Sequence, residues 1–355
     1  MRYTRKTLVA GAIVTSLALT ACGGDGEGES DSAEALSGKT CADFDLSSPP
    51  AEPVPIRIGH GDQTDAPLFV QFLAHEEAEL DHYGRWYTLD AQQFAPPDRL
   101  AAYQAGALDA GTAAAPQLLS GIEQGLDIAA VASLATIIDD GGETYAYSYL
   151  ALENSGIDGP EDLKGKKIGI IAPNTSTEYW AIAALQSAGL DARDAELVSV
   201  PPPTAEEALR SGQVDVQFFS DVFYALATQK GGLVEVFDGL TGPGFDQEFL
   251  SIWFDKGFVA DNPEAYCAWA ADYQKAMQFY LDERQAALRV LIEEGYDSAP
   301  SVDAALARKG PGRKADGRIN EENFQKLIDD SVETGFMDLT ISTDDVFLDG
   351  FSLTE

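Results

Sequence analysis

The chain has 355 residues, of which 59 are Asp or Glu and 23 are Lys or Arg, so its formal net charge is −36. A surface this acidic repels nucleic acid and anionic lipid head groups, which excludes nucleic acid as a partner. We interpret the excess of carboxylates as adaptation to a saline or alkaline medium rather than as an interaction surface.

The N-terminus has the pattern of an export signal. Arg2, Arg5 and Lys6 precede an apolar stretch at residues 8–19, which is shorter than the roughly 20 residues that span a bilayer. Residues 1–21 are therefore predicted to be a signal peptide. The stretch ends in Leu-Thr-Ala-Cys, which is typical of a bacterial lipobox and predicts acylation of Cys22. The alternative is an ordinary signal peptide with a chance cysteine.

Residues 22–53 are predicted to form the lipidated cysteine and a flexible acidic tether. Residues 23–36 are mostly Gly, Glu, Asp and Ser, and such a segment buries too little apolar surface to offset its ordering entropy. The rest of the chain is then expected outside the cell, held at the extracytoplasmic face of the membrane by the lipid anchor.

Two further cysteines remain after Cys22. An exported chain with two remaining thiols favours a disulfide between Cys41 and Cys267. The alternative is a pair of separate buried thiols.

Strand and helix patterns alternate in the first part of the chain. Strands are predicted at residues 55–59, 86–89 and 128–134, and helices at 66–81, 97–105 and 116–124. A segment of small residues at 110–115 lies between two of these helices, and an extended run is predicted at 144–152. Alternation of this kind favours an α/β fold with a largely parallel sheet.

The alternation then restarts, which indicates a second lobe. Strands are predicted at residues 167–171, 197–200, 214–219 and 233–237, and helices at 178–188, 204–211 and 221–230. A strand at 249–254 follows, and then a long amphipathic helix at 262–294. A further amphipathic helix is predicted within 315–335.

Three stretches resemble a known family. They are the sequence from Asp162 to Ile170 with Asn174 to Trp180, the sequence from Glu206 to Asp215, and the strand and helix start around Ala66 to Val70. Over residues 54–350 the chain resembles the substrate-binding proteins of ABC importers for nitrate, sulfonate and taurine. That family also includes binders of pyrimidine-type thiamine precursors.

The resemblance implies a type II periplasmic-binding-protein fold, with two α/β lobes joined by two hinge strands that close on a ligand. Lobe 1 is expected at residues 54–145 plus 248–355, and lobe 2 at 146–247. The hinge strands are expected at residues 144–152 and 249–253. The implied partners are a small-molecule ligand and the permease and ATPase subunits of the importer.

Ligand-binding residues are predicted where strands end, because open α/β sheets bind ligands beyond the carboxyl ends of their strands. The candidates are His60, Asp62, Gln63, Thr64 and Ala114 in lobe 1, and Asn174, Thr175, Ser176, Thr177, Asp221 and Tyr224 in lobe 2. Hydroxyls and NH groups at a helix start suit an anion, although plain helix capping is an alternative for the Asn174 loop.

No arginine is expected near these strand ends, so NH and OH groups would hold an oxyanion. Asp62 and Asp221 favour a ligand with a cationic or NH-donor part, although Asp221 could simply cap its helix. Aromatic residues near the hinge could stack a flat ring: Tyr145, Tyr147, Tyr179, Trp180, Phe219 and Tyr224. A zwitterion such as an aminosulfonate, or a heterocycle, is therefore preferred over nitrate.

Two other classes of function are weighed. The sequence shows no glycine-rich phosphate loop, metal-ligand cluster or Gly-x-Ser-x-Gly motif, so no enzyme activity, metal or cofactor is expected. A sensory lipoprotein with the same lobes is the second alternative. His75 and His82 are expected on the solvent side of one helix.

Overall fold

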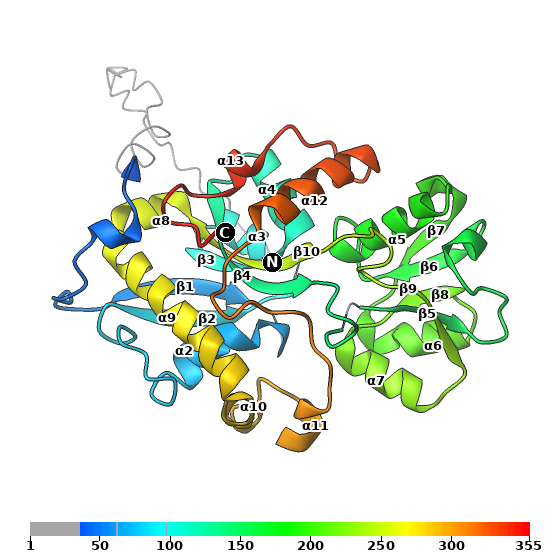
Figure 1. Ribbon diagram of the computed structural model, residues 1–355, viewed down its shortest axis with the longest axis horizontal. Helices are drawn as coiled ribbons and strands as arrows, with labels where there is room; N and C mark the ends of the chain where they lie inside the picture. The colour runs from blue at the N-terminus through cyan, green and yellow to red at the C-terminus, as the bar shows by residue number, and fades with distance from the viewer. Residues whose placement is uncertain (1–35, 62, 97, 146) are drawn as a thin grey trace, which may run out of the picture.

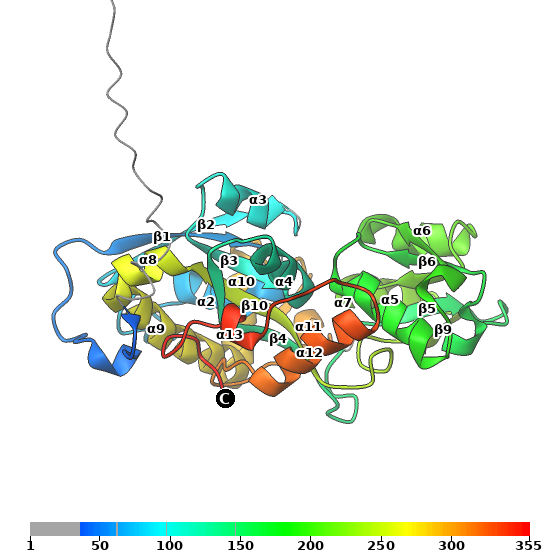
Figure 2. The same ribbon diagram turned by 90° about the horizontal axis from the view of Figure 1, so that it is seen from above.

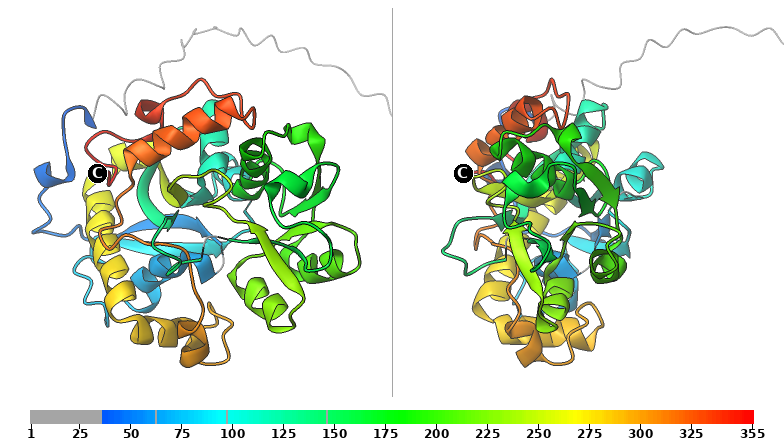
Figure 3. Two further views of the ribbon diagram at one scale, coloured as in Figure 1. Left: turned by 45° about the vertical axis from the view of Figure 1, so that its right-hand side comes forward. Right: turned by 90° about the vertical axis from the view of Figure 1, so that its right-hand side faces the viewer.

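The computed structural model describes residues 36–355 apart from residues 62, 97 and 146. The chain forms two α/β lobes that lie side by side (Figure 1). Views from above and from two further sides show the same two lobes (Figures 2 and 3). The predicted signal peptide and Cys22 lie outside the described residues, so both stay predictions.

The first lobe is built on a five-stranded sheet. Its strands are β1 (Val54–His60), β2 (Tyr87–Gln93), β3 (Ala110–Ala114), β4 (Ile128–Ile137) and β10 (Gln247–Asp255), in the order β2-β1-β3-β10-β4. β1 pairs in parallel with β2 and β3, whereas β10 runs antiparallel to both β3 and β4. A strand from late in the chain therefore lies inside a sheet made of early strands.

The second lobe repeats this arrangement. Its sheet has the order β7-β6-β8-β5-β9, with β5 (Tyr149–Leu152), β6 (Lys167–Ile170), β7 (Glu196–Ser199), β8 (Val216–Phe218) and β9 (Leu233–Phe237). β6 is parallel to β7 and β8, and β5 is antiparallel to β8 and β9. The predicted two-lobe fold of the type II periplasmic-binding proteins is confirmed.

Two connections join the lobes. Residues 138–148 lead from β4 to β5, and residues 238–246 lead from β9 back to β10. The hinge predicted at 249–253 is misplaced, because these residues pair with both β3 and β4 inside the first sheet. The first connection overlaps the predicted run at 144–152, of which the last four residues form β5. The predicted lobe boundaries stay a prediction.

Small residues of β3 make room for a large neighbour. A Cβ on Gly111 would lie 2.6 Å from Cζ2 of Trp253 in β10, and the Trp253 side chain is fully buried. Residues 110–114 of this segment, which have low strand propensity, form β3 because their small side chains fit beneath this indole.

Helices cover both faces of each sheet. α2 (Ala66–Leu73), α8 (Lys256–Asp261) and α9 (Pro263–Asp282) share one core with the first sheet, and α4 (Ala115–Glu123), α12 (Glu321–Glu333) and α13 (Thr343–Val346) share the other. In the second lobe α5 (Ser176–Ser187) packs on one face, and α6 (Ala205–Arg210) and α7 (Asp221–Gln229) on the other. The remaining helices of the first lobe are α3 (Asp98–Gln104), α10 (Arg284–Glu293) and α11 (Val302–Leu306).

One side of the lobe junction is packed. In α5, the Nε1 of Trp180 donates to Oε1 of Gln247 in β10 at 3.1 Å, and the hydroxyl of Tyr179 donates to Asp330 in α12 at 2.5 Å. The buried side chains of this region form one apolar cluster that extends from the second lobe into the first. Side chains of α5 in the second lobe thus contact both β10 and α12 of the first lobe.

A buried carboxylate fixes the start of β2. Asp272 in α9 is fully buried and accepts hydrogen bonds from the backbone NH groups of Asp81, His82 and Tyr83, at 2.8–3.1 Å. The ring Nδ1 of His82 lies 2.9 Å from the same carboxylate. The prediction that His75 and His82 lie on one helix is therefore wrong: the helix ends at Leu73, His75 lies in the turn after it, and His82 belongs to a loop bound by Asp272.

A disulfide joins Cys41 to Cys267 in α9, as predicted. It attaches the segment before β1 to the first lobe across a sequence separation of 226 residues. Within the described part of the chain, no helix has the length and hydropathy needed to span a membrane.

Candidate functional site

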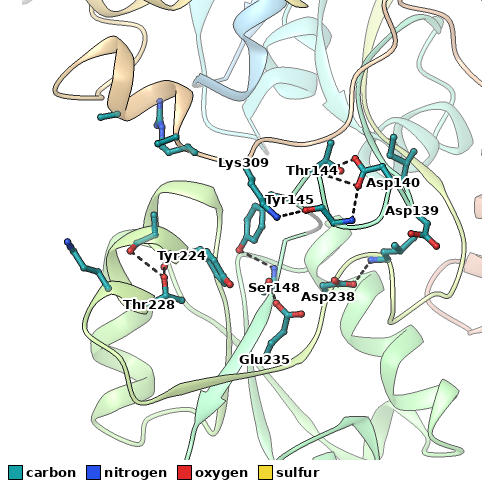
Figure 4. A pocket seen from close by; sticks show the side chains of 18 residues that line it. Asp139, Asp140, Thr144, Tyr145, Ser148, Tyr224, Thr228, Glu235, Asp238 and Lys309 are labelled. Carbon is teal, nitrogen blue, oxygen red and sulfur yellow. Dashed lines mark hydrogen bonds between the residues drawn. The ribbon is translucent and has the colours of Figure 1, made fainter.

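A pocket of about 830 Å³ lies where the two lobes meet, and we call it the interlobe pocket. Its walls come from the first connection, from α7 and β9 of the second lobe, and from residues 304–309 of the first lobe, as Figure 4 shows. A change in the angle between the lobes would alter its shape, because both lobes contribute walls. This is the property that a receptor closing around a ligand requires.

One polar and aromatic group lies within the interlobe pocket. The rings of Tyr145 and Tyr224 are 4.9 Å apart between centroids, and Tyr145 donates its hydroxyl to the carbonyl of Phe219 at 2.7 Å. Beside them Ser148 donates a hydrogen bond to the carboxylate of Glu235 in β9 (Figure 4). The pocket can therefore offer an aromatic face and a carboxylate to the same ligand.

Glu235 has an altered acidity. Glu235 is exposed as a residue, but partial desolvation of its carboxyl by the surrounding protein is the main cause that raises its pKa, and the nearby negative charge of Asp238 acts in the same direction. The bond from Ser148 opposes the shift. The pKa of the Tyr224 phenol is also raised, first by desolvation and then by the charge of Glu235. Perturbed acid groups in a pocket are typical of binding sites.

The other carboxylates of the pocket already accept backbone hydrogen bonds. Asp140 accepts from the NH groups of residues 142–144 at 2.8–3.2 Å. Asp238 accepts from the NH groups of Leu240 and Thr241 at 2.6–2.9 Å. Asp139, which also lines the pocket, accepts from the NH of Gly141 at 3.3 Å. These three carboxylates shape the two connections, which leaves Glu235 as the carboxylate best placed for a ligand.

Most predicted residues of the first lobe lie outside the interlobe pocket. His60 ends β1, is 3% exposed, and packs its ring against Phe69 and Tyr296. Burial is the main cause that lowers its pKa. Ala114 ends β3 as expected, and Thr64 lines a neighbouring cavity. Asp62 lies outside the described residues, and the side chain of Gln63 is likewise not described.

An arginine does lie at these strand ends, so the prediction of none is wrong. Arg99 of α3 is 6% exposed and its Nη1 donates to the carbonyl and hydroxyl of Thr112 in β3, at 2.8 and 2.6 Å. Thr112 in turn donates to Asp65 at 2.6 Å. A Cβ on Gly61 would lie 2.5 Å from Nη2 of Arg99. The arginine comes from a helix remote in sequence, and strand-end reasoning does not include it.

The loop before α5 is stabilised by its own hydroxyls. Thr175 donates to the carbonyl of Ala172 at 2.7 Å, and its hydroxyl lies 2.8 Å from that of Thr177, which accepts from the NH of Ile171. Thr175 makes no side-chain cap bond to the helix, so simple capping does not explain these hydroxyls. Binding by Asn174, Thr175, Ser176 and Thr177 stays a prediction.

Among the predicted ligand-binding residues whose side chains the structure describes, Tyr224 is the one that lines the interlobe pocket. Asp221 begins α7 as expected, but its side chain is not described. Among the predicted stacking aromatics, four are at most 3% exposed and belong to the core: Tyr147, Tyr179, Trp180 and Phe219. Tyr145 and Tyr224 are the pair that faces the pocket.

Sequence reasoning missed Ser148, Glu235, Arg308 and Lys309. One signal was available, since Glu235 interrupts the otherwise apolar strand at 233–237. The residues at 304–309 reach the pocket from the first lobe through tertiary packing alone. The described residues contain no cluster of three or more His, Cys, Asp or Glu side chains that could hold a metal ion.

Several solved structures are similar to this protein in fold. The alkanesulfonate-binding protein SsuA from Xanthomonas axonopodis pv. citri, bound to MOPS, is 20% identical, with a TM-score of 0.63 over 84% of this chain and 99% of that one. SsuA from Escherichia coli is 20% identical, with a TM-score of 0.62 over 83% and 92%. The nitrate-binding protein NrtA from Synechocystis PCC 6803 is 14% identical, with a TM-score of 0.59 over 84% and 85%.

The two sheets and the pocket between them thus define the periplasmic-binding-protein class of fold. The family model described as NMT1/THI5 like matches residues 89–287, more than half of the chain. The chain belongs to this NMT1/THI5-like family. No curated protein gives a significant sequence match.

Proposed function

We propose that this protein is the extracytoplasmic solute-binding component of an ABC importer and captures a small organic solute between its lobes by hinge closure. The observation that carries the proposal is the interlobe pocket, whose walls combine both lobes with the first connection. Cys22 would hold the protein at the membrane through its lipid anchor, and the permease and ATPase subunits would receive the solute. No catalytic step is part of this role.

The chemistry of the pocket favours two ligand classes. Glu235 suits a cationic or NH-donor group, so a taurine-like aminosulfonate is the first candidate. The Tyr145 and Tyr224 rings favour a pyrimidine or another flat heterocycle as the second. The structural neighbour SsuA is an alkanesulfonate-binding protein, which supports the first class.

A thermal-shift panel tests the proposal. The chain from residue 23 onward keeps every residue that the structure describes. It would be heated with taurine, alkanesulfonates, nitrate, bicarbonate, pyrimidines and flavins in turn. A ligand that binds the folded state alone raises the melting temperature with increasing concentration. One clear shift identifies the solute class, whereas no shift with any compound rejects both candidate classes.

Glu235→Gln should weaken binding of the solute found in this panel. If Glu235 pairs with a cationic group, loss of the charge should lower the affinity about tenfold to a hundredfold. Because the pKa of Glu235 is raised, wild-type affinity should fall as the pH is lowered through that pKa and the carboxylate takes up its proton. The variant should lack this pH dependence. Isothermal titration calorimetry at several pH values measures both effects.

Glu207→Gln is the matched control, since Glu207 is exposed on α6 of the same lobe and is not part of the pocket wall. It should bind as wild type does. Equal affinities for the Glu235→Gln and Glu207→Gln proteins would reject the role of Glu235.

Tyr224→Ala tests the alternative that the ligand is a flat heterocycle. This variant should reduce binding of a flat ring more than binding of an aliphatic sulfonate.

A further inference from the structure

A second cavity, of about 420 Å³, lies in the first lobe beside the interlobe pocket. It is bordered by α9, α10 and α11, by residues 307–313, and by Thr64 near the end of β1. Thr144, Arg308 and Lys309 line both spaces, so the two are neighbours. We call this second space the basic cavity.

The charge of the basic cavity is opposite to that of the protein. Four basic side chains line it, with two acidic ones, although acidic residues outnumber basic ones 59 to 23 in the whole chain. Arg308 is paired with Asp297 at 2.5 Å. Arg284, Lys309 and Arg313 have no carboxylate of the described chain within ion-pair distance. Glu143 is the other acidic residue of the wall, so basic side chains exceed acidic ones there by two (four against two).

The chain holds these cations close to one another. Arg313 donates to the carbonyls of Thr64, at 2.7 Å, and Leu134, and its guanidinium lies 5.3 Å from the ring centroid of Tyr280. Arg284 lies 4.3 Å from the same centroid. Two guanidinium groups near one ring repel each other, and a counter-anion would relieve that repulsion.

Arg284 stands between two helix ends. It comes two residues after Asp282, the last residue of α9, and is the first residue of α10. The dipole of α9 favours a positive charge there, and the dipole of α10 opposes it. Lys309 is exposed and its ammonium donates to the carbonyl of Gly142 in the first connection. An anion in the cavity would interact favourably with Arg284, Lys309 and Arg313 together.

We propose that the basic cavity binds a small organic oxyanion, meaning a molecule with a phosphate, sulfonate or carboxylate group. Arg284 and Lys309 contact the oxyanion, and Arg313 contributes its fixed charge from the cavity wall. The volume exceeds that of an inorganic ion, so the carbon portion of the ligand fills the rest against Leu281 and Leu288. This site is separate from the proposed solute role of the interlobe pocket and does not depend on it.

Isothermal titration calorimetry with inorganic phosphate as the probe tests the site. The chain from residue 23 onward is used, at an ionic strength kept constant with sodium chloride so that general screening does not change. The wild-type protein should bind one phosphate. Arg284→Gln and Lys309→Gln should each weaken the affinity about tenfold or more, because each removes a charge-assisted contact.

Arg289→Gln is the control on the same helix. Arg289 is exposed, lies 3.6 Å from Glu77, and is not part of the cavity wall, so this variant should bind phosphate as wild type does. Absence of phosphate binding to the wild-type protein would overturn the proposal. So would equal affinities for the Arg284→Gln, Lys309→Gln and Arg289→Gln proteins.

Two further variants separate this site from the proposed solute role. Glu235→Gln and Tyr224→Ala alter the interlobe pocket and leave the basic cavity intact. Both should bind phosphate with unchanged affinity, even if solute binding is lost or no solute is ever found. Loss of phosphate binding in these two variants, with retention in Arg284→Gln, would place the anion in the interlobe pocket and overturn the proposal.

Discussion

Replacement of both Cys41 and Cys267 by serine should lower the free energy of unfolding by about 5 kcal/mol. The disulfide closes a loop with a sequence separation of 226 residues, and in the chain-entropy account a loop of this length restricts the unfolded chain by about that amount. Guanidinium unfolding of the oxidised wild-type and double-serine proteins measures the difference.

Reduction of the wild-type protein provides the control for this experiment. With a reducing agent present, the wild-type protein should unfold at the same guanidinium concentration as the double-serine variant. The variant itself should not respond to the reducing agent. A midpoint that is equal in the oxidised wild type and the variant would show that the bond restricts the unfolded chain little.

Replacement of Asp272 by alanine should destabilise the protein by about 3–5 kcal/mol. The carboxylate is fully buried and accepts from three consecutive backbone NH groups and from the hydroxyl of Tyr87, the last at 3.1 Å. Its removal leaves the buried hydroxyl of Tyr87 and three partly buried backbone NH groups without this acceptor. Loss of one partner from a buried, hydrogen-bonded charged site has a cost in this range. The free energy of unfolding, from denaturant titration, measures the effect.

Asp282→Ala is the matched control for Asp272→Ala. Asp282 is the last residue of the same helix, is exposed, and accepts a hydrogen bond from Gln278 at 2.6 Å. Its replacement should change stability by no more than about 0.5 kcal/mol, as is usual for surface sites. If the two variants are equally stable, Asp272 does not hold the loop at 81–83 in the way described.

Much of the fold could be predicted because apolar runs and helix patterns are local signals. The strands at β1, β6, β7 and β9 follow short apolar stretches, and α5 and α7 follow recognisable helix starts. The strand β3 was not predictable from its own residues, since alanine and glycine disfavour strands. Its state depends on Trp253, which lies more than a hundred residues later in the sequence.

The ends of helices were less predictable for the same reason. The long helix expected at 262–294 is interrupted at Glu283, where neither proline nor glycine marks a break. The helix that begins at Ala66 ends at Leu73, because the loop after it is bound by Asp272. Both features depend on packing between distant segments, which a local pattern does not contain.

The candidate site was predicted in part. Strand-end reasoning leads to Tyr224, because it lies near the start of α7, the helix that follows β8 along the chain. Lys309 and Arg308 face the same pocket from the other lobe, and their positions depend on how residues 304–309 pack against the first connection. Arg99 reaches the ends of β1 and β3 from α3. None of these three has a sequence signal that ties it to a strand end.

The position of β10 has a consequence for the order in which the two lobes can fold. All five strands of the second sheet lie between residues 149 and 237, in one continuous stretch. The first sheet needs β10 between β3 and β4, which otherwise have no partner on the sides facing each other. During synthesis from the N-terminus, all strands of the second lobe are therefore made before β10. The second lobe can complete its sheet while the sheet of the first lobe still lacks β10. This order is the reverse of the usual one, in which the N-terminal domain folds first.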